Sequence, residues 1–155
     1  MMPALALTDL GNVFGMVKFY QEARAAGIKP ILGCDIHVSN PAERGKPFRI
    51  LLLCQSWAGY LRLCRLLTRA YLENQHRGRP EINKDWLRDG TDGLLALSGA
   101  HLGEIGAALL NGNGALARQS ALDWSGLFPG RFYLEVQRSG GAHDELHVRG
   151  AARGG

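Results

Sequence analysis

Residues 4–38, with the sequence ALALTDLGNVFGMVKFYQEARAAGIKPILGCDIHV, decide the fold of this chain. The apolar run 4–7 leads into the polar segment TDLGN, and this pattern predicts a buried strand of a parallel sheet. A helix is expected over residues 15–26, followed by a second strand over residues 29–38. Because α/β folds place their chemistry at the carboxyl ends of parallel strands, TDLGN is the first place to look for a site.

Two helices carry apolar residues at helical spacing. In the helix over residues 15–26, the apolar stripe comprises Phe14, Val17 and Tyr20. A longer helix is expected over residues 57–72, with Ser56 as its N-cap. Its apolar stripe comprises Trp57, Leu61, Cys64, Leu67 and Tyr71. Since residues three and four positions apart lie on one face of a helix, each helix has one apolar stripe, and we expect that of the longer helix to be buried.

The remaining chain also alternates strands with helices. Further strands are expected over residues 49–55, 93–98 and 131–137, and shorter helices over residues 84–88 (capped by Asn83), 102–110 and 115–127. The charged segment ENQHRGRP, residues 73–80, predicts a surface loop. This order indicates an α/β fold with a mainly parallel sheet or barrel. The pattern stops abruptly at both ends, so we expect a partial domain over residues 1–149 and an irregular tail over residues 150–155.

The composition indicates a single reduced domain. The chain has 155 residues, of which 46% are hydrophobic, enough for one core. Its three cysteines, Cys34, Cys54 and Cys64, form no CxxC pair and lie in apolar runs, which predicts reduced thiols in a cytoplasmic protein. No apolar run approaches the roughly eighteen residues of a membrane span. The net charge of +4 is spread out, which favours a solvated helix face over a nucleic-acid patch.

Four segments carry a resemblance to a known family. In chain order, they are residues 6–38, 51–72, 80–109 and 131–140. In sequence and in spacing they are similar to the PHP domain of the alpha subunit of bacterial DNA polymerase III, and the resemblance covers essentially residues 3–149. Four long segments in the correct order are a more specific signal than any short motif.

The resemblance implies both a fold and a role. The PHP domain resembles a distorted (β/α)7 barrel, so we expect an incomplete, TIM-barrel-like version in which the first strand and later strands are missing. In its intact form the domain carries His, Asp, Glu and Cys ligands for a cluster of metal ions. In some bacteria that cluster is expected to run a 3′–5′ exonuclease, and in others it has decayed and the domain docks a separate proofreading subunit. The family's polymerase palm, fingers and nucleotide-binding carboxylates would lie beyond residue 155.

Three ligand positions of the family are replaced here. Metal-assisted cleavage of phosphodiesters needs several ligands that converge on the ions. The family motif Thr-Asp-His-Gly-Asn is represented by residues 8–12, with Leu10 in place of the histidine. A further family histidine corresponds to Arg49, which would repel a divalent ion, and a family cysteine corresponds to Ala100. The family's first His-x-His motif would precede Met1. We therefore expect a degenerate site without catalytic residues.

Four residues remain as vestigial metal ligands: Asp9, Asp35, His37 and His101. Asp35 replaces a family glutamate with a shorter side chain. His37 shares a face of its strand with Asp35, so the two either bind metal or form a hydrogen-bonded pair. Asp9 either binds metal or, with Asn12, satisfies backbone groups of the turn. His101 is either a displaced ligand or a surface or capping residue.

Two further groups of polar residues are interpreted as structural. Glu135 and Gln137 lie on the last expected strand, where they are expected to stabilise the barrel. His143 and His147 would share one face of a helix, but HDELH lacks the order of a zinc-binding HExxH motif, so we expect a solvated face.

The leading hypothesis is a fragment of the replicative DNA-directed DNA polymerase that covers most of its PHP domain. Its role would be structural, with docking of the 3′–5′ proofreading exonuclease subunit, and we expect no activity of the fragment alone. Its partners would be the rest of the polymerase III holoenzyme and, through the parent protein, DNA, with no membrane. No cofactor is expected, and zinc or manganese would bind only if the site were retained. The alternatives are a metal-dependent PHP phosphoesterase or 3′–5′ exonuclease, and a nucleic-acid-binding module.

Overall fold

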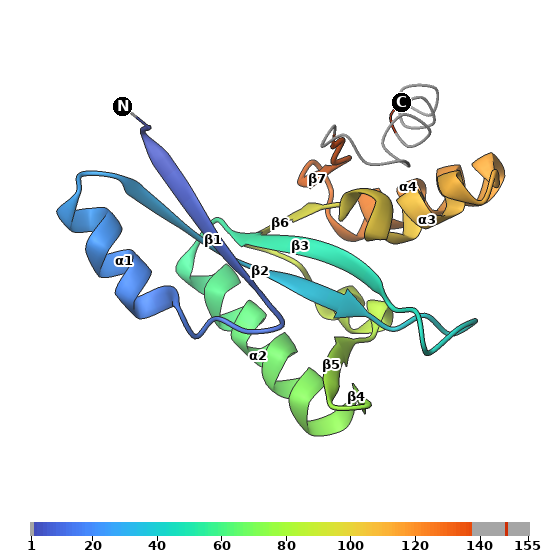
Figure 1. Cartoon of the computed structure of the whole chain (residues 1–155), viewed down its shortest axis with the longest axis horizontal. Coiled ribbons are helices and arrows are strands. Elements are labelled where there is room, and N and C mark those ends of the chain that lie inside the picture. The colour runs from blue at the N-terminus through green and yellow to red at the C-terminus, as the bar shows by residue number, and fades with distance from the viewer. Residues whose placement is uncertain (1, 138–147, 149–155) are drawn as a thin grey trace.

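The chain contains both strands and helices, mixed along the sequence (Figure 1). The computed structural model describes residues 2–137 and residue 148. The strands are β1 (Ala4–Leu10), β2 (Lys29–Val38), β3 (Phe48–Cys54), β4 (Gln75–His76), β5 (Arg79–Ile82), β6 (Leu94–Leu97) and β7 (Phe132–Tyr133). The helices are α1 (Met16–Ala25), α2 (Trp57–Glu73), α3 (Glu104–Leu110) and α4 (Gly114–Leu127), with 3-10 turns η1 (Lys84–Asp89) and η2 (Ala100–Leu102).

One mixed sheet organises these elements. The strand order is β4-β5-β2-β3-β6-β7, and β1 pairs in parallel with β2. The pairs β2–β5 and β6–β7 are also parallel, but β3 runs antiparallel to both of its neighbours, β2 and β6. The sheet is therefore mixed rather than mainly parallel. The reason lies in residues 39–47, which join β2 to β3 directly, because a parallel pair would need a longer crossover connection.

The core lies between one face of the sheet and α2. Alternate residues of β2, including Cys34 and Ile36, point to this face, and Leu52 of β3 continues it. From α2, the buried side chains are Leu63, Leu66, Leu67 and Ala70. Helices α3 and α4 lie together near β7 (Figure 1) and add Ile105, Trp124 and Phe128 to the same core. The opposite face of β2 and β3 carries the polar residues described below.

Strand β1 is an exposed edge strand, so the prediction of a buried strand is wrong. In the described residues it pairs only with β2, and Leu5 and Leu10 are exposed. The strand also continues to Leu10, so that Thr8 and Asp9 belong to the strand and not to the turn after it. The turn begins at Gly11, whose φ of 70° favours glycine.

The apolar stripe of α1 is exposed, and the prediction of a buried stripe on α2 is wrong for the most part. Phe14 is 85% exposed and Trp57 is 71% exposed, and Ala23 is the one buried residue of α1. Among the predicted stripe residues of α2, only Leu67 is buried. Helix α2 carries apolar side chains on two faces, and their spacing alone does not say which face meets the sheet. The small residues Gly59 and Ala70 lie on the face that does.

Other local predictions hold, with two corrections. Ser56 caps α2 by accepting a hydrogen bond from the Gly59 N–H, and Asn83 caps η1 in the same way from Asp85. The predicted loop over residues 73–80 instead contains the short β4–β5 hairpin, and the last strand is confined to β7. All three cysteines are free. In the part of the chain that is described, no helix is long and apolar enough to cross a membrane.

Candidate functional site

A row of polar and charged side chains lies on the sheet face opposite the core. Asp35 and His37 point to this face, because the residues that alternate with them, Cys34, Ile36 and Val38, are buried on the other. In the strand register, Leu10 of β1 lies opposite Asp35, and Arg49 of β3 lies opposite His37. Opposed residues of neighbouring strands share a face. The fold therefore brings Leu10, Asp35, His37 and Arg49 together.

Arg49 holds the carboxylate of Asp35 in a two-pronged contact. The Arg49 Nε donates to Asp35 Oδ1 at 3.0 Å, and Nη2 donates to Oδ2. The two side chains are 27% and 25% exposed, so the pair is largely withdrawn from water. The hydrogen bond to Asp35 raises the pKa of Arg49 above its ordinary value. Such fork-to-fork pairs are among the stronger polar contacts in proteins.

A small pocket surrounds this pair. It has a volume of about 270 Å³, and its lining includes Thr8, Asp35, Arg49, His101 and Glu135. Glu135 is held there because its backbone N–H donates to the Ser98 hydroxyl at 2.9 Å. The pocket therefore contains two carboxylates, one guanidinium and one imidazole, contributed by segments that are far apart in the sequence.

The other expected site residues lie elsewhere or play a different part. The register places Asp9 opposite Cys34, and the Asp9 carboxylate accepts a hydrogen bond from the Gly15 N–H at 3.3 Å, at the start of α1. Asp9 is absent from the lining of the Asp35 pocket. Ala100 is buried. His143 and His147 lie outside the described residues.

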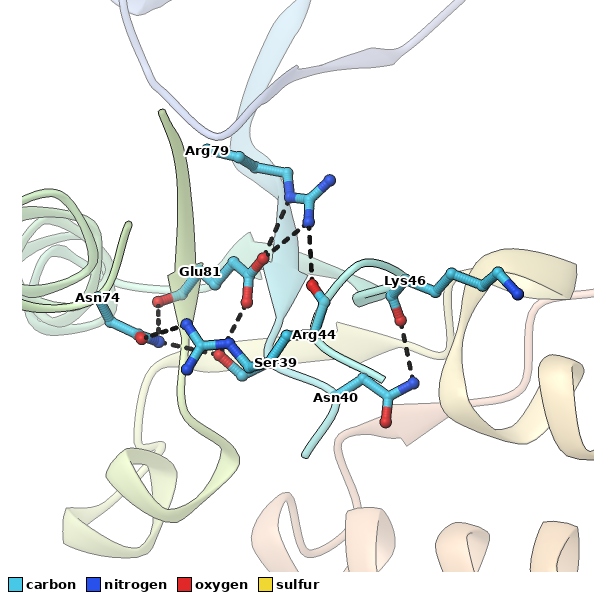
Figure 2. Close-up of polar contacts among 7 residues, drawn as sticks. All are labelled: Ser39, Asn40, Arg44, Lys46, Asn74, Arg79 and Glu81. Carbon is cyan, nitrogen blue, oxygen red and sulfur yellow. Dashed lines mark hydrogen bonds and ion pairs between the residues drawn. The ribbon is translucent and has the colours of Figure 1, made fainter. Parts of the chain in front are cut away.

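A second arginine–carboxylate pair was missed by the sequence analysis (Figure 2). Glu81 is fully buried, and its Oε1 accepts from Arg79 Nε at 3.1 Å and Nη2 at 2.9 Å. The Ser39 hydroxyl lies 3.0 Å from Glu81 Oε2, and Asn74 donates to both the Ser39 hydroxyl and the Glu81 carbonyl oxygen. The alternation in RPEI, residues 79–82, was the available signal for a strand here.

This second pair also anchors the connection between β2 and β3. The Arg44 side chain donates to Asn74 at 3.2 Å, and the Arg44 carbonyl oxygen accepts from Arg79 at 3.5 Å. Figure 2 shows Arg79 in contact with Glu81 of the same strand, β5, and with the Arg44 carbonyl group. The network therefore joins three segments, which are residues 39–47, the end of α2 and the β4–β5 hairpin.

His37 lies between the two arginine pairs. It is opposite Arg49 in β3 and opposite Glu81 in β5. Burial lowers the pKa of His37 below its ordinary 6.5, and the charges of Arg79 and Arg49 lower it further, against the opposing effect of Asp35 and Glu81. A histidine in this environment is held in its neutral form.

The lowered pKa of His37 predicts a pH dependence of stability. Below about pH 6.5 the unfolded chain binds a proton at this residue more readily than the folded chain. Stability is therefore fully present above that pH and is lost as the pH falls towards the lower folded-state pKa. We expect the Tm to decline less between about pH 7.5 and pH 5.5 in a His37→Gln variant than in the unmodified chain. An unchanged slope of Tm against pH would contradict this assignment.

The residues present on this face do not fit a cluster of bound metal ions. Within residues 2–137 and residue 148, no three His, Cys, Asp or Glu side chains are grouped so that they could hold a metal ion. Asp35 faces the guanidinium of Arg49 with both oxygens, and Leu10 offers no donor atom beside it. A divalent cation at Asp35 would meet a fixed positive charge.

Comparisons with known proteins agree on one family. A family model described as the PHP domain matches residues 1–139. The DNA polymerase III subunit alpha of Neisseria meningitidis serogroup A is 50% identical over 139 residues, which are 88% of this chain and 12% of that protein. The subunits of the same name from Pseudomonas aeruginosa and Escherichia coli K12 are 45% and 37% identical over 150 residues, which are 97% of this chain and 13% of each relative.

The chain thus spans only 12–13% of the length of these curated relatives. The matched region is nevertheless continuous and includes both arginine–carboxylate pairs and every element from β1 to β7. Because the family model covers most of its length, the chain belongs to the PHP domain family.

Proposed function

We propose that this chain forms most of the PHP domain of a bacterial replicative DNA polymerase III alpha subunit and has a structural role there. The observation that carries the proposal is the contact of Arg49 with both oxygens of Asp35, in the pocket where the resemblance places metal ligands. Leu10 beside Asp35 and the buried Ala100 supply no ligand. The domain therefore acts without a metal cofactor and without a catalytic centre of its own.

The parent protein is a cytoplasmic DNA-directed DNA polymerase that works on DNA within the polymerase III holoenzyme. This part of the proposal is supported by relatives that carry the name DNA polymerase III subunit alpha. The domain extends over residues 1–149 and forms an incomplete distorted (β/α)7 barrel. The β1–α1–β2 unit, in which β1 and β2 pair in parallel, and the polar row on the sheet face opposite α2 support that architecture.

The structural role includes docking of the 3′–5′ proofreading exonuclease subunit. Exposed apolar side chains on α2 and at the start of α1 support it, since monomeric soluble proteins rarely expose large contiguous apolar patches. Phe14 is 85% exposed and Leu72 is 80% exposed. Both line one groove between the β1–α1 turn and α2, together with Val13, Cys64 and Tyr71. Such a groove offers apolar area that a protein partner can bury.

Metal content is the first test of this function. The chain is stripped with chelator, reloaded with zinc or manganese, and analysed by atomic emission. We expect less than about 0.1 ion per chain, because a fixed guanidinium faces the Asp35 carboxylate. Tight, stoichiometric metal binding would contradict the structural role. Chelator-sensitive hydrolysis of p-nitrophenyl phosphate would favour a PHP phosphoesterase instead.

Exonuclease binding is the second test, and it is independent of metal. A Phe14→Ser/Leu72→Ser variant is expected to weaken binding of the separately purified exonuclease subunit by about tenfold or more, measured by calorimetry. The matched control is Leu122→Ser, which removes an apolar side chain that is 63% exposed on α4. Equal affinity of both variants and the unmodified chain would exclude the α1–α2 groove as the docking site.

A further inference from the structure

We infer that Arg49 is a resident cation, which takes the place of a metal ion as the counter-charge of the Asp35 pocket. This inference rests on the proposed structural role and deepens it, because it says what holds the site together in the absence of metal. It assigns a positioning role to a residue at which the family resemblance indicates only a lost ligand.

The first support is that the guanidinium lines one pocket with two acidic side chains. Arg49 contacts both oxygens of Asp35, and the charge of Glu135 also acts on it. Asp35, Arg49 and Glu135 line one pocket but come from β2, β3 and the segment after β7. Without a cation, these carboxylates would repel each other across a partly buried space. Arg49 therefore joins β3 to β2, and its charge lies in the same pocket as a carboxylate from the segment after β7.

The second support is a second arginine–carboxylate pair on the same face of the sheet. Glu81 is fully buried, and Arg79 supplies its counter-charge through two hydrogen bonds to Oε1. His37, between the pairs, stays neutral because burial lowers its pKa and the charges of Arg79 and Arg49 lower it further. Asp35 of β2 and Glu81 of β5 are thus each paired with an arginine, a cation that is part of the chain itself. An arginine side chain stays protonated at all physiological pH values and cannot dissociate into solution.

If Arg49 is the counter-charge, divalent metal ions should change the stability of the chain only after Arg49 has been removed. In an Arg49→Ala variant, Asp35 and Glu135 lose their counter-charge, so we expect the Tm to fall by roughly 3–8 °C. Millimolar Mn²⁺ is then expected to raise the Tm of the variant by a few degrees through binding to the folded state. The same Mn²⁺ and an excess of chelator should each leave the Tm of the unmodified chain within about 1 °C.

Three variants separate a counter-charge from ordinary packing. Asp35→Asn/Arg49→Ala removes the uncompensated carboxylate and is expected to recover at least about half of the lost Tm. Arg49→Lys keeps the positive charge and should lose less than Arg49→Ala. Arg88→Ala removes the partner of Asp85 from an exposed pair and should change the Tm by less than about 1 °C.

The outcomes distinguish this inference from the proposed function. A Tm of Arg49→Ala equal to that of the unmodified chain, or a double variant no more stable than the single variant, would overturn the role of Arg49 alone. Stoichiometric metal in the unmodified chain would overturn the structural role as well. If Arg49→Ala fails to fold, a folded double variant supports the inference, whereas two unfolded variants contradict it.

Discussion

Replacement of Gly59 by alanine is expected to lower the free energy of unfolding by about 3 kcal/mol or more. A Cβ atom at this position would overlap the backbone carbonyl group of Gly93. Gly59 is buried in the first turn of α2, and its N–H donates to the Ser56 hydroxyl at 3.1 Å. Because the position of a Cβ atom is fixed by the helix backbone and the group it meets is also backbone, no side-chain rotation can relieve the overlap. Helix α2 would have to move away from the start of β6.

Urea denaturation followed by circular dichroism measures this change, and α4 provides the control. Gly126 is an exposed helical position where a new Cβ would meet nothing within 4 Å. Gly126→Ala is therefore expected to raise the free energy of unfolding by about 0.5–1 kcal/mol, since alanine has the higher helix propensity. A Gly59→Ala variant as stable as the unmodified chain would show that α2 and the start of β6 do not approach this closely.

Helices and their caps could be predicted because their signals are local. Ser56 and Asn83 each accept a hydrogen bond from a backbone N–H at most three residues away, and the helix expected over residues 57–72 is observed as α2. The burial of its faces is set by distant residues. Trp57 has the larger apolar side chain, yet the small residues Gly59 and Ala70 are on the side that packs closely. The periodicity of apolar residues therefore predicts an apolar stripe on a helix but not which part of the protein packs against it.

The candidate site was also predictable only in part, because its contacts depend on residues that are distant in the sequence. Strand alternation correctly places Asp35 and His37 on one face. The pairing of Asp35 with Arg49, however, depends on the antiparallel register between β2 and β3, and the sequence led us to expect a mainly parallel sheet. The Arg79–Glu81 pair was missed because residues 73–80 contain the glycine and charge that are typical of loops. Tertiary pairing turned part of that segment into β5.

The other large effect is expected at Arg79. An Arg79→Met variant keeps much of the side-chain volume but leaves the fully buried Glu81 carboxylate, among the described residues, with only the Ser39 hydroxyl as a side-chain partner. Leaving a buried charge unpaired is strongly destabilising, so we expect the free energy of unfolding to fall by about 3 kcal/mol. Arg79→Met/Glu81→Gln should recover part of this loss, because a neutral amide costs less to bury than a carboxylate. Urea denaturation of these two variants, of Glu81→Gln and of the unmodified chain in one buffer completes the double-mutant cycle.

Local proteolysis separates this network from a general loss of stability. Arg79 also donates to the Arg44 carbonyl oxygen, so its removal should free the connection between β2 and β3 and speed tryptic cleavage after Arg44. The control is Arg88→Met, since Arg88 and its partner Asp85 are 68% and 72% exposed and their pair contributes little. If Arg79→Met and Arg88→Met were equally stable and equally resistant to cleavage, the buried pair would not hold residues 39–47 in place. If only Arg79→Met is cleaved faster, the charged face of the sheet also fixes the loop beside it.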